Sequence, residues 1–236
     1  MNIMVRPATK NPCYQAGRRI TPQGIMIHSI GVPQPDPKVI VNNFNQTDAD
    51  SCVHAVLGLG EDVYQILPWD YRAWHCGSGP NGSGNNTYIS FEMTEPSTIR
   101  YTSGADWEDL DPEATRSFVL QVYQGAVRLA AYLCRLYGFD PEGKNVIISH
   151  VEGYRLGIAS NHADVEHLWS REGLSMEQFR RDVAARLQKP DENGGGDGEI
   201  LFPYIVQAGA FQSEENARRL VAELEAAGFS AYVRKI

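Results

Sequence analysis

Short apolar runs that end at glycine or at polar residues recur through the first 150 residues of the chain. Their length and their content of β-branched and aromatic side chains are typical of buried strands. Strands are predicted over residues 24–31, 87–93 and 145–150, and two more within 52–68, joined by a turn at 60–62. We therefore expect a sheet whose strands come from well-separated parts of the sequence.

The strongest helical pattern covers residues 112–137. Asp111 is suited to cap this helix, Pro112 fits its first turn, and Gly138 is suited to end it. A second helix is predicted to begin at Ser175, with the glutamine of a capping box three residues later. Strands mixed with these helices indicate an α/β or α+β domain built around one sheet.

Residues 189–199 are polar and rich in glycine, which is typical of a flexible linker. This linker predicts a large domain over residues 1–188 and a small module over 200–236. The small module has the pattern of a strand, an amphipathic helix and a second strand, over 204–211, 213–228 and 230–236. At about 34 residues, this unit is shorter than domains that fold alone. It therefore needs a partner surface, a second copy of itself or further sequence.

The formal charge of the 236-residue chain is −8. An acidic chain gains nothing from counterion release on DNA or RNA, so nucleic acid is not an expected partner. The N-terminal residues lack the apolar core of a signal peptide, and no run approaches the roughly 20 apolar residues of a membrane helix. We therefore expect a protein that is made in the cytoplasm without a signal peptide, is not inserted in a membrane, and acts on an external target only after release.

His28 and His150 share a position: each follows an apolar strand and precedes a turn. Strand ends of a central sheet converge, so these two side chains can meet although they are far apart in sequence. Two neutral imidazoles with one carboxylate or thiolate form a typical catalytic zinc site. Cys52 and Cys76 each lie near another histidine and are weaker ligand candidates, because the chain has no CxxC pair. The alternative is that each histidine is half-buried with an ordinary hydrogen bond.

Five segments occur in an order that is more specific than any one of them: "IMIHSIG", "VHAVLGLGEDVYQILPWDYRAWHCG", "NNTYISFEM", "IISHVEG" and "ASNHADVEHLW". Together they resemble the zinc-dependent N-acetylmuramoyl-L-alanine amidases of the amidase-2 type, which are relatives of the peptidoglycan recognition proteins. The resemblance covers roughly residues 20–185. It implies a mixed central sheet flanked by helices, with one Zn²⁺ in a groove that binds peptidoglycan.

The resemblance also implies roles for single residues. His28 and His150 match the first two zinc ligands, and Asp164 matches the third. Glu92 matches the catalytic carboxylate that takes a proton from water. His162 stands where many members have lysine, so its imidazole is expected to stabilise the developing oxyanion. In the alternative assignment His162 is itself the third zinc ligand, and Asp164 contacts a ligand rather than the metal.

Other residues in the matched segments are expected to line the groove or support the site. Candidates for contact with sugar or peptide are Trp74, His75, Asn86 and Arg155. For the tryptophan, packing in the core is the alternative. His54 is expected to support the metal ligands. Glu166 and His167 are expected to take no part in the chemistry, and His167 to be exposed or to pack near Trp169.

The C-terminal segment "YIVQAGAFQSEENARRLVAELEAAGFSAYVRK" resembles the first half of a SPOR domain. That family binds peptidoglycan, notably glycan strands without stem peptides. A full domain is about twice as long, so glycan binding by this module is in doubt. The half-domain could pair with a second copy to form a homodimer, dock on the large domain, or be a remnant.

The sequence thus predicts a zinc enzyme that hydrolyses the amide bond between N-acetylmuramic acid and L-alanine in peptidoglycan. A phage or prophage endolysin and a bacterial autolysin both fit this prediction. The alternative is a recognition module that binds peptidoglycan without cutting it. Such modules typically lack a zinc ligand, whereas all three candidate ligands are present here. A nuclease built on Asn161 and His162 fits poorly with the acidic chain.

Overall fold

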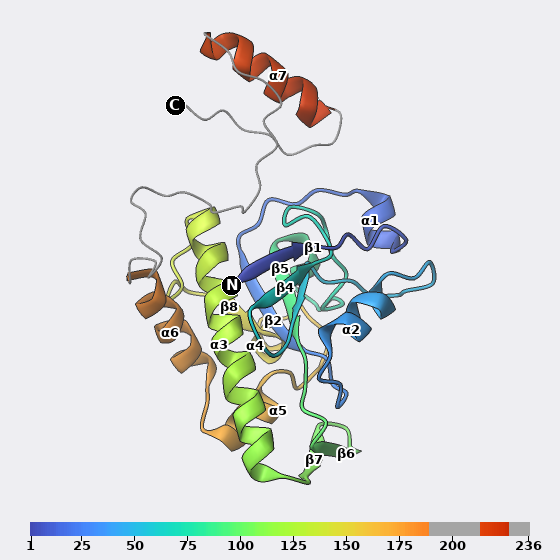
Figure 1. The fold of residues 1–236 in the computed structure, drawn as a ribbon, viewed down its shortest axis with the longest axis vertical. Helices are drawn as coiled ribbons and strands as arrows, with labels where there is room; N and C mark the ends of the chain where they lie inside the picture. Colours follow the sequence, from blue (N-terminus) through green and yellow to red (C-terminus); the bar gives the residue numbers. More distant parts are fainter. Residues whose placement is uncertain (189–212, 227–236) are drawn as a thin grey trace. The chain divides into compact units, whose positions relative to one another are not determined.

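The computed structural model describes residues 1–188 and 213–226. The chain divides into two compact units, Met1–Pro190 and Asp191–Ile236. In the first unit, six strands form one mixed sheet (Figure 1). In spatial order these are β1 (Asn2–Val5), β4 (Asp62–Gln65), β3 (Ala55–Leu57), β5 (Tyr88–Met93), β2 (Gly24–Ser29) and β8 (Ile147–Ser149). Only β3 and β4 pair antiparallel, and every other neighbouring pair is parallel.

One face of the sheet is covered by two helices that pack on each other, α3 (Pro112–Tyr137) and α6 (Met176–Gln188) (Figure 1). The Asp111 carboxylate caps α3 by accepting a hydrogen bond from the amide of Ala114, and Gly138 ends the helix in the left-handed conformation. The prediction for 112–137 is therefore confirmed at both ends. Alternate residues of the strands, such as Ile25 and Ile27 of β2, fill the core beneath these helices.

The intervening residues of the strands face the other way and form two smaller apolar clusters. Val56 of β3 packs with Ile40 of α2 (Pro37–Phe44), and Cys13 of α1 (Pro12–Ala16) lies at the edge of this cluster. Met26 of β2 packs in the second cluster. The central mixed sheet with helices on its faces confirms the predicted fold class.

Three parallel strands bring their carboxyl ends to one place. His28 of β2 is the register partner of Glu92 of β5, and Ile27 is the partner of Ser149 of β8. The strand predicted over 145–150 ends one residue earlier, because Ser149 and Glu152 form a capping box. His150 is therefore the first residue of helix α4 (His150–Arg155), next to the end of β2.

Several short elements follow or precede these strands and were not predicted. They include a hairpin of β6 (Ile99–Ser103) and β7 (Asp106–Asp109), and the 3₁₀ helices η1 (Gly84–Asn86) and η2 (Ser170–Glu172). A further short helix, α5 (Glu166–Trp169), contains His167. In the second unit, helix α7 (Glu214–Ala226) lies within the predicted helix 213–228. The predicted linker and the strands over 204–211 and 230–236 lie outside the described residues. No helix in the described part of the chain is long and apolar enough to span a bilayer.

Candidate active site

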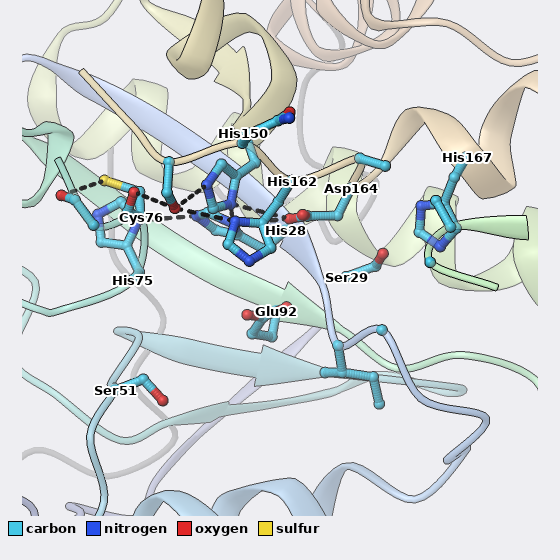
Figure 2. Close-up of a pocket in the computed structure, with 18 of the residues that line it drawn as sticks. His28, Ser29, Ser51, His75, Cys76, Glu92, His150, His162, Asp164 and His167 are labelled. Atoms are coloured by element: carbon cyan, nitrogen blue, oxygen red, sulfur yellow. Dashed lines mark hydrogen bonds and ion pairs between the residues drawn. The ribbon is translucent and has the colours of Figure 1, made fainter. Parts of the chain in front are cut away.

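Three side chains from different elements converge at the carboxyl end of the parallel strands (Figure 2). The Nδ1 atom of His28 lies 3.1 Å from Nδ1 of His150 and 3.0 Å from Oδ2 of Asp164. The Nδ1 atom of His150 lies 3.5 Å from the same carboxylate oxygen. His28 lies on β2, His150 directly follows β8, and Asp164 lies in the loop before α5. Two nitrogens and one oxygen thus form a nearly equilateral triangle.

The size and chemistry of this triangle fit a zinc ion. Ligand atoms at roughly 2.0–2.1 Å from a tetrahedral zinc lie about 3.3 Å from one another. The three observed separations of 3.0, 3.1 and 3.5 Å bracket that value. Two imidazoles and one carboxylate are a donor set of catalytic zinc sites. The residues present are therefore suited to hold the metal that the donor set indicates.

The protonation states of His28 and Asp164 also suit metal binding. Burial lowers the pKa of His28, against the opposing effect of Asp164, so the imidazole is favoured in its neutral, ligating form. Burial raises the pKa of Asp164, but hydrogen bonds from His150 and His28 outweigh this and hold it well below its ordinary value. The aspartate is therefore ionised. A neutral imidazole and a carboxylate are the forms that bind a metal ion.

His75 contacts the His28 ring on the side opposite the triangle and so helps to orient it. Nδ1 of His75 lies 2.9 Å from Nε2 of His28, so the nitrogen of His28 that faces away from the triangle has a fixed partner. The backbone amide of His75 is in turn held by the side chain of Asn85, at 2.7 Å. Burial lowers the pKa of His75 well below its ordinary value, so this ring is neutral as well. His75 was predicted to lie near substrate; it lines the cavity described below and also contacts His28, one of the candidate ligands.

The triangle opens into a cavity of about 830 Å³, which we call the histidine cavity. Glu92 lines it from β5, and its Oε2 atom is buried without a hydrogen-bond partner among the described residues. Burial, together with the charges of Asp164 and Glu95, raises the pKa of Glu92 well above its ordinary value. Figure 2 shows the carboxylate across the cavity from the histidines. A carboxylate with a raised pKa and an unpartnered oxygen is a better proton acceptor than an exposed carboxylate.

His162 lies at the mouth of the histidine cavity with an exposed ring. Its Nδ1 atom lies 3.0 Å from the hydroxyl of Ser160, which also lies 3.4 Å from Nε2 of His150. Ser160 therefore links His162 to His150, one of the candidate ligands, and the sequence did not single Ser160 out. Asp164, and not His162, completes the triangle of candidate ligands.

A second group of buried side chains forms the wall beside Asp164. The Tyr101 hydroxyl of the β6–β7 hairpin donates to the buried carboxylate of Glu95 at 2.7 Å and lies 2.6 Å from Nε2 of His167. The other oxygen of Glu95 accepts from the amide of Gly31, at 2.9 Å. His167 is buried in the cavity wall rather than exposed, because it packs against this tyrosine. The sequence gave no signal of this role for Tyr101, because the tyrosine lies on a short, mostly exposed strand.

Of the other residues that were predicted to line or support the site, only some lie at the histidine cavity. Trp74 is 41% exposed and lines the histidine cavity. Asn86 and Arg155 are exposed and do not line that cavity, so the structure does not bring them to the site that was predicted for them. His54 is fully buried. Its Nε2 atom donates to the carbonyl of Tyr71, and burial lowers the pKa of His54 to about 4.

The cysteines and Glu166 also lie outside the triangle of ligands. Cys76 lines the cavity but its thiol is held by Asn85 and by backbone carbonyls, and Cys52 is buried. Cys134 is a core residue of α3. Glu166 accepts a hydrogen bond from the Ser149 hydroxyl at 2.7 Å.

Comparisons with solved structures find the same fold in other proteins. The hydrolase AmiA of Staphylococcus aureus, solved in complex with its ligand, is 19% identical, with a TM-score of 0.59 over 79% of this chain and 83% of that chain. The catalytic domain of XlyA is 18% identical, with a TM-score of 0.56 over 78% of this chain and 99% of that chain. At these identities the likeness establishes the fold.

Comparisons of sequence establish the family. The curated N-acetylmuramoyl-L-alanine amidase CwlH of Bacillus subtilis (strain 168) is 42% identical over 48 residues, which is 19% of each protein. The profile of the SPOR domain matches residues 202–236. The profile of the N-acetylmuramoyl-L-alanine amidase family, Amidase_2, matches residues 17–167, which include five of the six strands of the sheet, Glu92 and the whole triangle of candidate ligands. The chain therefore belongs to the N-acetylmuramoyl-L-alanine amidase family.

Proposed function

We propose that this protein is a zinc-dependent hydrolase that cuts the amide bond between the lactyl group of N-acetylmuramic acid and the L-alanine of the stem peptide. One observation carries the proposal: His28, His150 and Asp164 form a zinc-sized triangle at the edge of a cavity that also holds an unpartnered carboxylate. Membership of the amidase family supplies the substrate class.

His28, His150 and Asp164 would hold the metal. A bound Zn²⁺ supplies Lewis acidity to a carbonyl oxygen and to a water molecule. Glu92 accepts the proton of the attacking water at its free Oε2 atom, because no other side chain among the described residues competes for that atom. Because the pKa of Glu92 is raised, the carboxyl group holds this proton until it is transferred to the leaving amine.

His162 stabilises the charge that develops on the scissile carbonyl. Its ring is exposed to the cavity, and the Ser160 hydroxyl at Nδ1 leaves the other nitrogen free to donate to a substrate oxygen. A hydrogen bond that strengthens as the oxyanion forms lowers the barrier more than it tightens substrate binding. The proton held by Glu92 then reaches the departing amine of L-alanine.

A module that only recognises peptidoglycan would need the groove without the ligand triangle. The complete triangle and the buried, unpartnered Glu92 therefore favour hydrolysis over recognition. We place the protein among the endolysins or autolysins, with peptidoglycan as its partner. The C-terminal SPOR match supports retention on the cell wall. Homodimer formation through that module stays a prediction.

The proposal is tested by metal analysis combined with digestion of purified peptidoglycan. We expect about one zinc per wild-type chain, close to none in Asp164→Ala, and an unchanged content in Glu92→Ala, with both variants inactive. The matched control is Glu166→Ala, which removes a nearby carboxylate outside the triangle and should keep both metal and activity. Zinc-loaded wild type that releases no free stem peptides would contradict the proposal.

A further inference from the structure

Two of the four cysteines of the chain lie together, outside the triangle of candidate ligands. Cys13 lies on α1 and Cys52 lies in the segment before β3, and their thiols are joined by a hydrogen bond. Cys13 also packs against the apolar cluster that contains Cys52. Neither Cys76 nor Cys134 is hydrogen-bonded to another cysteine among residues 1–188 and 213–226. Cys13 and Cys52 therefore form a pair, and all four cysteines are free thiols in this structure.

A buried asparagine holds the two backbone segments of this pair together. Asn11 caps α1, and its Oδ1 atom accepts a hydrogen bond from the amide of Cys13 at 2.8 Å. Its Nδ2 atom donates to the carbonyl of Phe44 at 2.8 Å and to the carbonyl of Ser51 at 2.9 Å. One fully buried side chain thus contacts the backbone of Cys13 and the residue directly before Cys52.

The backbone of Cys52 is fixed on its other side by Trp74. The amide of Cys52 donates to the carbonyl of Trp74 at 2.9 Å, and the amide of Trp74 donates to the carbonyl of Cys52 at 3.2 Å. The Cys52 side chain is fully buried, and its sulfur lies 3.4 Å from the carbonyl oxygen of Val53, which is a second acceptor for the thiol proton. The two thiols are therefore held next to each other by backbone segments that hydrogen bonds fix in the folded protein.

The two thiols differ in access and in acidity. Cys13 is partly exposed and lines a cavity of about 290 Å³, so a small reagent can reach its sulfur. A hydrogen bond from Cys52, opposed by burial and assisted by the charge of Arg72, lowers the pKa of Cys13 to about 7. The same hydrogen bond, together with burial, raises the pKa of Cys52 well above its ordinary value. At neutral pH Cys13 is therefore the nucleophile of the pair, because the thiolate is the reactive form.

We propose that Cys13 and Cys52 are a redox-active pair that closes to a disulfide and so ties α1 to the segment before β3. The oxidant is a small-molecule disulfide. The Cys13 thiolate attacks one sulfur of this disulfide, so that a mixed disulfide forms at Cys13 and one thiolate leaves. Cys52 then gives up its proton and attacks the Cys13 sulfur, which displaces the second thiolate. The two cysteines lose two electrons, and the reagent is reduced to two thiols.

The second step is helped by the first. The largest cause of the raised pKa of Cys52 is its hydrogen bond to Cys13, and the charge of the Cys13 thiolate adds to it. A Cys13 sulfur in a mixed disulfide carries no charge, so both effects end when the first step is complete. Cys52 therefore becomes more acidic at the moment when its thiolate is required.

The disulfide would close a loop that contains β2 and α2, and β2 carries His28. A cross-link of this kind stabilises a protein mainly by restricting its unfolded chain. Peptidoglycan lies outside the reducing cytoplasm, so the bond would form where the enzyme meets its substrate. That last consequence rests on the proposed function, whereas the pairing of the two cysteines does not.

The test is oxidation of the full-length, folded protein with excess oxidised glutathione at neutral pH, followed by alkylation and mass spectrometry. We expect two of the four thiols to disappear, peptides joined through Cys13 and Cys52, and no glutathione left on the protein. At a fixed zinc concentration, the oxidised protein should have a Tm higher by roughly 4–16 °C, and dithiothreitol should remove the difference. No assay of hydrolysis is involved, so the result does not depend on the proposed amidase activity.

Three variants identify the residues of the bond. Cys13→Ser should keep the fold, because Cys13 is partly exposed, and should lose both the reaction and the rise in Tm. Cys52→Ala should stop at one glutathione bound to Cys13. Cys134→Ala is the matched control, since it removes a buried cysteine outside the pair and should form the disulfide as the wild type does. Four free thiols after oxidation, glutathione that stays on wild-type Cys13, a disulfide that includes Cys76, or a disulfide without a rise in Tm would overturn the proposal.

Discussion

Metal binding should stabilise the first unit, and the size of the effect follows from the structure. Three potential ligands converge from elements that are far apart in sequence, so an unfolded chain has no equivalent site. A ligand at about 100 times its dissociation constant stabilises the folded state by about 2.7 kcal/mol. For a unit the size of Met1–Pro190, each kcal/mol raises Tm by about 2–4 °C. Zinc should therefore raise Tm by about 5–11 °C over the chelator-treated protein.

Thermal unfolding followed by near-ultraviolet circular dichroism measures this shift, because the signal reports the packing of the aromatic core around α3. Three variants show which side chains are responsible for the rise in Tm that zinc causes. Asp164→Ala should lose the shift at the same zinc concentration, because it removes one corner of the triangle. His162→Ala and Glu92→Gln should keep it, because neither side chain belongs to the triangle.

The reasoning would be refuted by two results. If zinc leaves the Tm of the wild type unchanged at every concentration, the converging atoms do not form a metal site. If the shift persists in Asp164→Ala and disappears in His162→Ala, the third ligand is the histidine, and the roles of these two residues must be exchanged.

Three further changes test the surroundings of the site. In His54→Asn, the protein should lose less stability on acidification: the buried imidazole has its pKa lowered from 6.5 to about 4, so its contribution is complete above pH 6.5 and is lost as the pH falls towards 4. The difference between wild type and variant should reach about 3 kcal/mol in urea unfolding, and parallel curves would contradict it. Tyr101→Phe should lower stability by about 1–3 kcal/mol in the same assay, because the buried carboxylate of Glu95 loses a hydrogen bond; an unchanged midpoint would argue against this network. His162→Lys should keep its zinc and extend hydrolysis to higher pH, since a lysine amine stays protonated to about pH 10; loss of zinc would make His162 a ligand.

The sequence predicts those parts of the site that lie on regular elements. His28 and Glu92 lie on neighbouring strands. Successive side chains of a strand point to opposite faces of the sheet, so the residues that face the core alternate with those that face the cavity. His150 was predicted because it ends an apolar run, although a serine cap makes it the first residue of a helix. Asp164 lies in a loop, so periodicity carries no information about its direction, and only the order of the family motifs identified it.

The supporting residues could not be predicted for a related reason. Apart from the contact of Ser160 with His162, Ser160, Tyr101 and Glu95 act through contacts with residues that are 6 to 84 positions away in sequence, and no local pattern records such pairs. The short helices α1 and α2 have five and eight residues, which is too few turns to establish a helical period. The β6–β7 hairpin is mostly exposed, so it lacks the apolar alternation that revealed the central strands.

The isolation of Glu92 also predicts a conflict between activity and stability. A buried carboxylate oxygen without a partner destabilises the folded state, and the protein retains it at the place where a base is required. In the absence of metal, Glu92→Met should therefore be inactive but more stable than the wild type by about 1–3 kcal/mol. Because the pKa of Glu92 is raised on folding, its neutral form is tolerated at low pH and stability is lost as the pH rises through the raised pKa. The advantage of Glu92→Met in urea unfolding with chelator should accordingly grow from pH 5 to pH 9. A constant or shrinking difference would show that Glu92 is already solvated or paired, and that its role as the base needs another explanation.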